Sequence, residues 1–265
     1  MLSKVIFKMA KIDLGKSWDK VAKQWFEEWE PTFKQGLIWG PYGPFEKDVK
    51  LIPPLKGKRV LVLGCGSGPD VWWLKENGAE KVVGVDLSKE QLALAKERMK
   101  KVNLAAEFIQ KDFDKITNAD FTKESFDIII SNYALQYAKD LPRLFKSVFH
   151  FLKPKGKFIF SCDHPVMTAT YKSRQKDERE KDFKNFDYLN SRTIYWNFRV
   201  GNKDVAAYNY HRPISYILNG LVDVGFHVDK MLEPRPDTHS TAYYDESFEL
   251  AKRLPYTIIF VASKT

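Results

Sequence analysis

The stretch Val60-Leu61-Val62-Leu63-Gly64-Cys65-Gly66-Ser67-Gly68 decides the fold class of this chain. Its apolar run predicts a buried strand over Arg59–Leu63, and a helix is expected over Pro69–Asn77. Three glycines at alternate positions separate the two elements, where they let the backbone turn sharply and approach a ligand without a Cβ clash. A strand, a glycine-rich turn and a helix in this order predict the first unit of a nucleotide-binding α/β sheet.

Downstream of this turn, short apolar runs alternate with amphipathic segments, which predicts βαβ units and a mostly parallel sheet. Further strands are expected at Lys81–Asp86, Glu107–Gln110, Phe126–Ser131, Lys157–Cys162, Phe226–Leu232 and Tyr256–Ala262. A helix is expected to begin at Ser88, because Gln91 follows three residues later and completes a capping box. Asp140 and Pro213 are expected to open two more helices.

Two segments depart from this alternation. Residues 1–57 are rich in aromatic side chains. Five residues of this segment recur at the spacing of one helix face, namely Trp18, Val21, Ala22, Trp25 and Trp29. Residues 165–212 contain a densely charged run, Lys172–Lys184, and then an aromatic run that favours β structure, Tyr188–Tyr210. We therefore expect an N-terminal helical segment over 1–57 that packs on the core, and a catalytic domain over 58–265 with an insertion at 165–212.

A carboxylate, Asp86, ends the second expected strand 22 residues after Gly64, where it can accept hydrogen bonds from both ribose hydroxyls of an adenosine. A dinucleotide motif would need its third glycine at position 69, but that residue is Pro69, which offers a pyrophosphate no N–H group. The pattern therefore favours S-adenosylmethionine over a nicotinamide dinucleotide, and a nucleotide-dependent oxidoreductase remains an alternative.

Five motifs, in this order along the chain, resemble those of class I S-adenosylmethionine-dependent methyltransferases of the small-molecule type. They are Val60–Gly68, Val83–Ser88, Gln110–Phe113, Phe126–Tyr137 and Leu152–Gly156. The resemblance implies a Rossmann-like, mostly parallel seven-stranded α/β sheet with helices on both faces and an antiparallel last strand. It implies that S-adenosylmethionine donates a methyl group by in-line displacement and leaves as S-adenosylhomocysteine.

The same resemblance implies a set of cofactor-binding residues. They are Tyr42, Gly64, Cys65, Gly66, Gly68, Asp86, Leu87, Asp112, Phe113 and Asn132. Within this set, the three glycines are expected beside the methionine part of the cofactor and Asp86 on the ribose. Leu87 is expected against the adenine face, Asp112 and Phe113 at the adenine, and Asn132 near the transferred methyl.

Three residues near the insertion are candidates for the acceptor side of the site. His164 follows the fifth strand, at the sheet edge where open α/β folds bind ligands, and His211 closes the insertion. Asp163 can orient either imidazole. We expect both histidines to face the acceptor pocket as substrate contacts or bases, with the aromatic run Tyr188–Tyr210 covering it. The alternatives are that His164 anchors its loop and that His211 caps the following helix.

Charge makes RNA the first alternative acceptor, because the 265-residue chain has 43 basic and 34 acidic side chains and a net charge of +9. Against nucleic acid, the lysines are spread along the chain without a dense basic tail. Nucleic-acid amino-methylases usually have Asn/Asp-Pro-Pro-aromatic after the fourth strand, and here the residues are Ser131-Asn132-Tyr133-Ala134. A small-molecule methyl acceptor is therefore the expected partner.

The remaining expectations concern metals, membranes and location. Cys65 and Cys162 form no spaced cluster with histidines, so no metal is expected. No apolar run approaches the ~18 residues of a membrane span, and residues 1–13 show no cleavage site. We expect a cytoplasmic monomer or homodimer without a membrane partner. A non-catalytic cofactor-binding protein is a further alternative.

Overall fold

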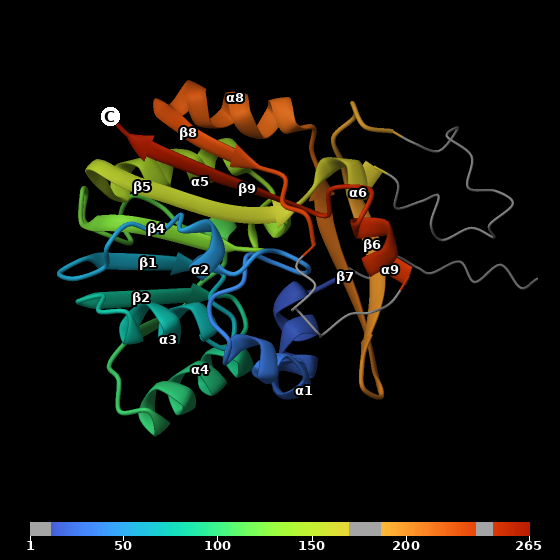
Figure 1. Cartoon of the computed structure of the whole chain (residues 1–265), viewed down its shortest axis with the longest axis horizontal. Helices are drawn as coiled ribbons and strands as arrows, with labels where there is room; N and C mark the ends of the chain where they lie inside the picture. Colours follow the sequence, from blue (N-terminus) through green and yellow to red (C-terminus); the bar gives the residue numbers. More distant parts are fainter. Residues whose placement is uncertain (1–11, 170–186, 237–245) are drawn as a thin grey trace, which may run out of the picture.

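The computed structural model describes residues 12–169, 187–236 and 246–265, and a seven-stranded sheet forms its centre (Figure 1). The strand order is β3-β2-β1-β4-β5-β9-β8. The strands are β1 (Arg59–Leu63), β2 (Lys81–Asp86), β3 (Glu107–Gln110), β4 (Phe126–Asn132), β5 (Leu152–Asp163), β8 (Phe226–Leu232) and β9 (Thr257–Lys264). Only β9 runs against the other strands of this sheet, pairing antiparallel with β5 and β8. The expected seven-stranded, mostly parallel fold is confirmed.

Among the strands, β5 differs most from what the sequence predicts. The sequence predicts a turn at Lys153–Gly156 and a strand that begins at Lys157. The structure begins the strand at Leu152, which pairs with Phe126. The pairing then shifts register before Ile128 meets Lys157, and Lys155 adopts a left-handed φ of 62°. The segment therefore bulges inside a paired strand, because its ends keep their hydrogen bonds to β4.

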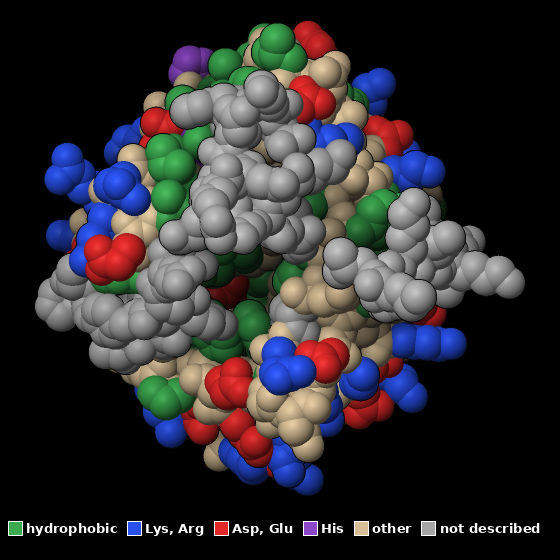
Figure 2. Space-filling model, turned by 90° about the vertical axis from the view of Figure 1, so that its right-hand side faces the viewer, with side chains coloured by type: hydrophobic (Ala, Val, Ile, Leu, Met, Phe, Trp, Pro, Cys, Tyr) green, Lys and Arg blue, Asp and Glu red, His purple; other side chains and the backbone are tan. Residues whose placement is uncertain are grey.

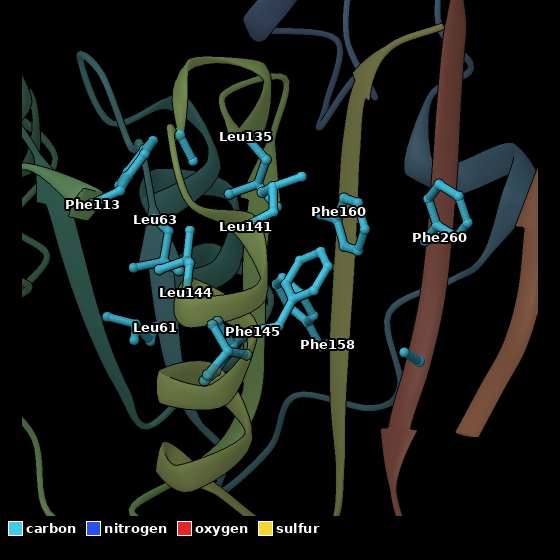
Figure 3. Close-up of a cluster of buried hydrophobic side chains, with 14 of the residues drawn as sticks. Leu61, Leu63, Phe113, Leu135, Leu141, Leu144, Phe145, Phe158, Phe160 and Phe260 are labelled. Atoms are coloured by element: carbon cyan, nitrogen blue, oxygen red, sulfur yellow. The ribbon is translucent and has the colours of Figure 1, made fainter. Parts of the chain in front are cut away.

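Helices cover both faces of the sheet because β1 is apolar on both sides. Leu61 and Leu63 belong to a core shared with α5 (Leu141–Phe151) and α8 (Ile214–Val224). Figure 3 shows part of this core, with Leu144 and Phe145 of α5 beside Phe158 of β5. Val60 and Val62 face the opposite core, which includes residues of α3 (Pro69–Glu76) and α4 (Lys89–Lys101). Burial on both faces explains why this strand has no polar alternation.

The expected N-terminal helix is present as α1 (Leu14–Phe33), and it packs against α4 and β7 (Figure 1). The aromatic part of the insertion forms a separate antiparallel hairpin, β6 (Arg192–Val200) and β7 (Lys203–His211). The charged run Lys172–Lys184 lies outside the described residues. None of the helices in the described ranges is both long and apolar enough to span a bilayer.

The remaining helical elements are short. They are α2 (Glu46–Val49), α6 (Pro165–Ala169), α9 (Glu246–Ala251), and the 3-10 turns η1 (Phe113–Lys115) and η2 (Leu135–Tyr137). The turns η1 and η2 follow β3 and β4 directly, so both lie at the carboxyl edge of the sheet.

Candidate active site

A cavity of about 1060 Å³ opens at the carboxyl ends of β1, β2, β4 and β5. Figure 2 looks onto this side of the molecule and shows the hollow, with hydrophobic and acidic side chains in its depth. Open α/β sheets bind ligands at this edge. Its volume is at the top of the ~300–1,000 Å³ range of a single-ligand pocket, so the cavity has room for a cofactor and a small acceptor together.

The glycine turn after β1 forms one wall of the cavity. Gly66 lies on this wall at φ 51°, and a Cβ added there would meet only Gln91 Oε1, 3.8 Å away. Gly68 is different, because it is the N-cap of α3 and its added Cβ would lie 2.9 Å from the Cβ of Ala95. Gly66 therefore leaves space for a ligand, whereas Gly68 is required for the packing of α3 on α4 and does not line the cavity.

Asp86 ties this turn to the next helix. One carboxylate oxygen accepts a hydrogen bond from the backbone N–H of Gly66 at 2.8 Å, and the other accepts one from the N–H of Ser88 at 2.8 Å. Burial raises the pKa of Asp86, and these backbone donors lower it in part. A carboxylate has about four acceptor positions. Asp86 can therefore bind ribose hydroxyls while it also holds the turn.

A second buried carboxylate, Asp70, lies beside Asn132. Asn132 donates its amide N–H groups to Asp70 Oδ1 at 3.2 Å and to the carbonyl of Ile38 at 2.7 Å, and it accepts a hydrogen bond from Ser161 Oγ at 2.9 Å. Asp70 is 7 % exposed and lines the cavity. Burial raises its pKa to about 7, although the hydrogen bond from Asn132 opposes the shift.

Sequence reasoning missed Asp70. Its only signal was an acidic residue in the first turn of a helix, next to Pro69, and the favourable charge at a helix N-terminus already explains such a residue. The structure adds a second property, because the side chain is buried and faces the same cavity as the glycine turn.

The structure brings most of the expected cofactor residues to one cavity. Its lining includes Tyr42, Gly64, Cys65, Gly66, Asp86, Leu87, Asp112, Phe113 and Asn132. Leu87 and Phe113 offer apolar contacts, and Asp112 Oδ1 accepts the N–H of Asp114 at 3.0 Å. Nearby, the buried Oε1 of Gln91 has no hydrogen-bond partner among the described residues. This lining suits S-adenosylmethionine, which has a flat aromatic base, a ribose and a charged methionine end.

The two histidines expected at the acceptor pocket do not line the cavity. His164 is 1 % exposed, with Nε2 lying 2.7 Å from Glu233 Oε1 and Nδ1 accepting the N–H of Val166 at 3.1 Å. His164 thus anchors the loop that begins α6. The position at the end of β5 was correct, but the imidazole turns toward these partners and away from the cavity.

His211 is buried in the same way. It is fully shielded from solvent, with Nδ1 lying 2.6 Å from Thr168 Oγ1 and Nε2 lying 2.8 Å from the carbonyl of Tyr188. Burial lowers the pKa of both His164 and His211. The ring therefore links β7 to α6 and to the start of the aromatic run at Tyr188, and both of its nitrogens are used.

Asp163, the third residue expected on the acceptor side, does line the cavity. Its carboxylate accepts hydrogen bonds from the hydroxyl of Tyr133 and the amide of Asn209, whereas the imidazoles that it was expected to orient bond to Glu233 and Thr168. Burial and the nearby charge of Asp163 raise the pKa of Tyr133 well above its usual value, so the phenol stays protonated and donates. Residues from β5, β7 and the turn after β4 thus meet at one carboxylate.

Comparison with known proteins places this geometry in a family. The methyltransferase domain family matches residues 54–203. A protein of Haemophilus influenzae whose function is uncharacterised is 28 % identical over 218 residues, which cover 80 % of this chain and 83 % of that protein. Phosphoethanolamine N-methyltransferase of Triticum aestivum is 34 % identical over 140 residues, which cover 52 % of this chain but only 27 % of the wheat enzyme.

A solved structure agrees with this assignment. The S-adenosylmethionine-dependent methyltransferase of Mesorhizobium loti is 26 % identical with a TM-score of 0.60, and the match covers 81 % of this chain and 94 % of that one. The family match spans more than half of the chain, and the strand order, the glycine turn and the cavity at the carboxyl edge of the sheet agree with it. The chain therefore belongs to the methyltransferase domain family and is a class I S-adenosylmethionine-dependent methyltransferase.

Proposed function

We propose that this methyltransferase acts on a small-molecule acceptor bound in the same cavity as the cofactor. The observation that carries the proposal is the continuity of the cavity, which extends from the glycine turn to a wall of aromatic side chains. That wall comes from α1, the loop before α2, η2 and the β6–β7 hairpin. A hollow lined by aromatic rings suits a compact organic molecule better than a nucleic-acid strand.

In this proposal, residues 58–265 form the methyltransferase domain, 165–212 are its insertion, and 1–57 pack on it. Asp86 would hold the ribose, Leu87 and Phe113 the adenine, and Asn132 with Asp70 the methionine end. S-adenosylmethionine supplies a methyl group already activated on a sulfonium sulfur. The residues of the chain then need to bind donor and acceptor in line and to exclude water. The name of the wheat relative, which specifies a small acceptor, supports this choice.

A labelling screen tests the proposal. The protein is incubated with methyl-labelled S-adenosylmethionine and, separately, with a metabolite extract and total RNA. We expect label in a small molecule. Asp86→Ala should bind the cofactor about 10- to 150-fold more weakly and transfer less label, since a hydrogen bond to a charged group contributes ~1.5–3 kcal/mol. Label found only in RNA, or none in either pool from protein that binds the cofactor, would contradict the proposal.

A further inference from the structure

The acceptor half of the cavity is the part lined by aromatic rings rather than by the glycine turn. These rings belong to Trp18, Trp25, Trp29, Tyr133, Tyr137, Trp196, Tyr208 and Tyr256. The ring of Trp18 lies 5.6 Å from that of Trp25 and 6.1 Å from that of Tyr137, edge-on to both. Aromatic faces attract other rings and also cations, and tryptophan is the strongest cation binder among them.

The carboxylate of Asp163 lies against these rings. Tyr133 and Asn209 both donate hydrogen bonds to it, which fixes its direction and stabilises its negative charge. Tyr133 is attached to β4 and Asn209 to β7, so the two donors also hold the hairpin against the sheet. The acceptor half therefore offers a ligand an oriented negative charge inside an apolar wall.

The charge of the cavity is opposite to that of the chain. Its described lining contains six aspartates, Asp13, Asp70, Asp86, Asp112, Asp114 and Asp163, against three cationic side chains, Lys16, Lys115 and Arg199, whereas the chain as a whole has a net charge of +9. Arg199 is exposed and paired with Asp204 at 2.8 Å, and Lys16 is exposed as well. This field favours a cationic ligand and opposes a phosphorylated one.

The described lining contains no histidine, so the groups in it that can take up a proton are carboxylates, among them Asp70, whose pKa is raised to about 7. His164 and His211 lie outside the cavity, and no other histidine of the described ranges lines it. Burial raises the pKa of the Cys65 thiol far above its usual value. A hydroxyl acceptor normally loses its proton to a base before or during attack. A neutral amine has a lone pair that is nucleophilic enough to attack the sulfonium methyl without a base during the attack, so an amine is the acceptor that this lining favours.

We propose that the acceptor is an amine attached to an aromatic or apolar body, and that Asp163 binds the positive charge at its nitrogen. This inference rests on the proposed function. The ammonium form first loses a proton to water. The nitrogen lone pair then forms the new N–C bond with the methyl group while the C–S bond breaks and its electron pair stays on sulfur. Positive charge thus moves from sulfur to nitrogen, where Asp163 stabilises it.

Equilibrium binding tests the inference without requiring turnover. The probes are 2-phenylethylamine, 2-phenylethanol, 3-phenylpropionate and phosphoethanolamine, each titrated into the complex with S-adenosylhomocysteine and followed by tryptophan fluorescence. We expect 2-phenylethylamine to bind at least about tenfold more tightly than the alcohol, as a cation at a carboxylate and aromatic faces should. The carboxylate and phosphate probes should bind more weakly than the alcohol.

The variant Asp163→Asn should lose this preference for the amine by about tenfold while keeping its affinity for S-adenosylhomocysteine. Asp223→Asn, which removes an exposed aspartate of α8 outside the cavity, should leave both affinities unchanged. Equal affinity for amine and alcohol, no binding of any probe, or an unchanged preference in Asp163→Asn overturns the inference. Methyl label on the nitrogen of the amine, located by mass spectrometry, supports it.

The two proposals can fail separately. If the amine binds selectively but no small molecule is methylated, the role of Asp163 in binding an amine is supported and the proposed function is contradicted. Methyl transfer to an alcohol or a carboxylic acid upholds the proposed function and overturns the amine assignment.

Discussion

At the scale of single residues, Asp70 is the group whose charge state should respond to the cofactor. Burial raises its pKa from 3.8 to about 7, so at about pH 6 most free protein holds the protonated acid, and at about pH 8 most holds the carboxylate. The sulfonium and ammonium groups of S-adenosylmethionine together outweigh its single carboxylate. A cationic ligand favours the ionised form of Asp70, so binding should release a proton at pH 6 and become tighter as pH rises toward 8.

Calorimetry at pH 6 in two buffers of different ionisation enthalpy measures this proton release. We expect Asp70→Asn to abolish the release, because an amide does not titrate. The matched control is Asp48→Asn, which removes an exposed aspartate of α2 outside the cavity and should change nothing. An equal proton release from Asp70→Asn and the parent protein would show that another group titrates.

At the scale of elements, α1 is held on the sheet domain by a specific contact with α4. Asp19 of α1 accepts hydrogen bonds from Ser88 Oγ at 2.6 Å and from the backbone N–H of Glu90 at 3.1 Å. Both partners lie at the N-terminus of α4, where a negative charge is favourable. On the other side, the hydroxyl of Ser17 donates to the carbonyl of Ala206 in β7 at 2.7 Å. The helix thus joins the cofactor half of the site to the hairpin.

Removal of this contact should loosen the wall of the cavity. We expect Asp19→Ala to lower the free energy of unfolding by ~1–2 kcal/mol, which corresponds to a fall in Tm of ~2–8 °C in a chain of this size. Cofactor affinity should fall too, since Trp18 of the same helix lines the cavity. Lys23→Ala, which breaks only an exposed ion pair with Glu27, should stay within ~0.5 kcal/mol. Equal effects of the two variants on stability would refute this role of Asp19.

At the scale of the whole molecule, positive charge and binding cavity are separated. Figure 2 shows lysine and arginine side chains spread around the visible face, while the cavity lining holds more carboxylates than cations. We expect RNA to bind weakly at the exterior, with an affinity that falls at least ~10-fold between about 50 and about 200 mM salt. Anisotropy titrations measure this fall, and S-adenosylhomocysteine should not alter it. Binding that resists salt and leads to methylation at one RNA position would contradict the expectation.

The sequence alone determined the sheet and its glycine turn. The bounds of β1, β2, β3 and β8 matched their predicted residues, because a buried strand depends on a local apolar run and a turn on local glycine and proline chemistry. The approximate position of the cofactor site followed for the same reason. Carboxyl ends of parallel strands meet at one edge, so residues far apart in sequence, such as Gly66, Asp86 and Asn132, line one cavity.

Only the tertiary structure decided where the side chains beyond those strand ends point. His164 follows β5 as predicted, yet its imidazole turns to Glu233, and His211 is fixed by Thr168. Asp163 instead meets Tyr133, which follows β4, and Asn209 of β7. Such directions depend on which buried donors and acceptors need partners after the chain is folded. That requirement is set by contacts between distant segments, and no local pattern in the sequence encodes it.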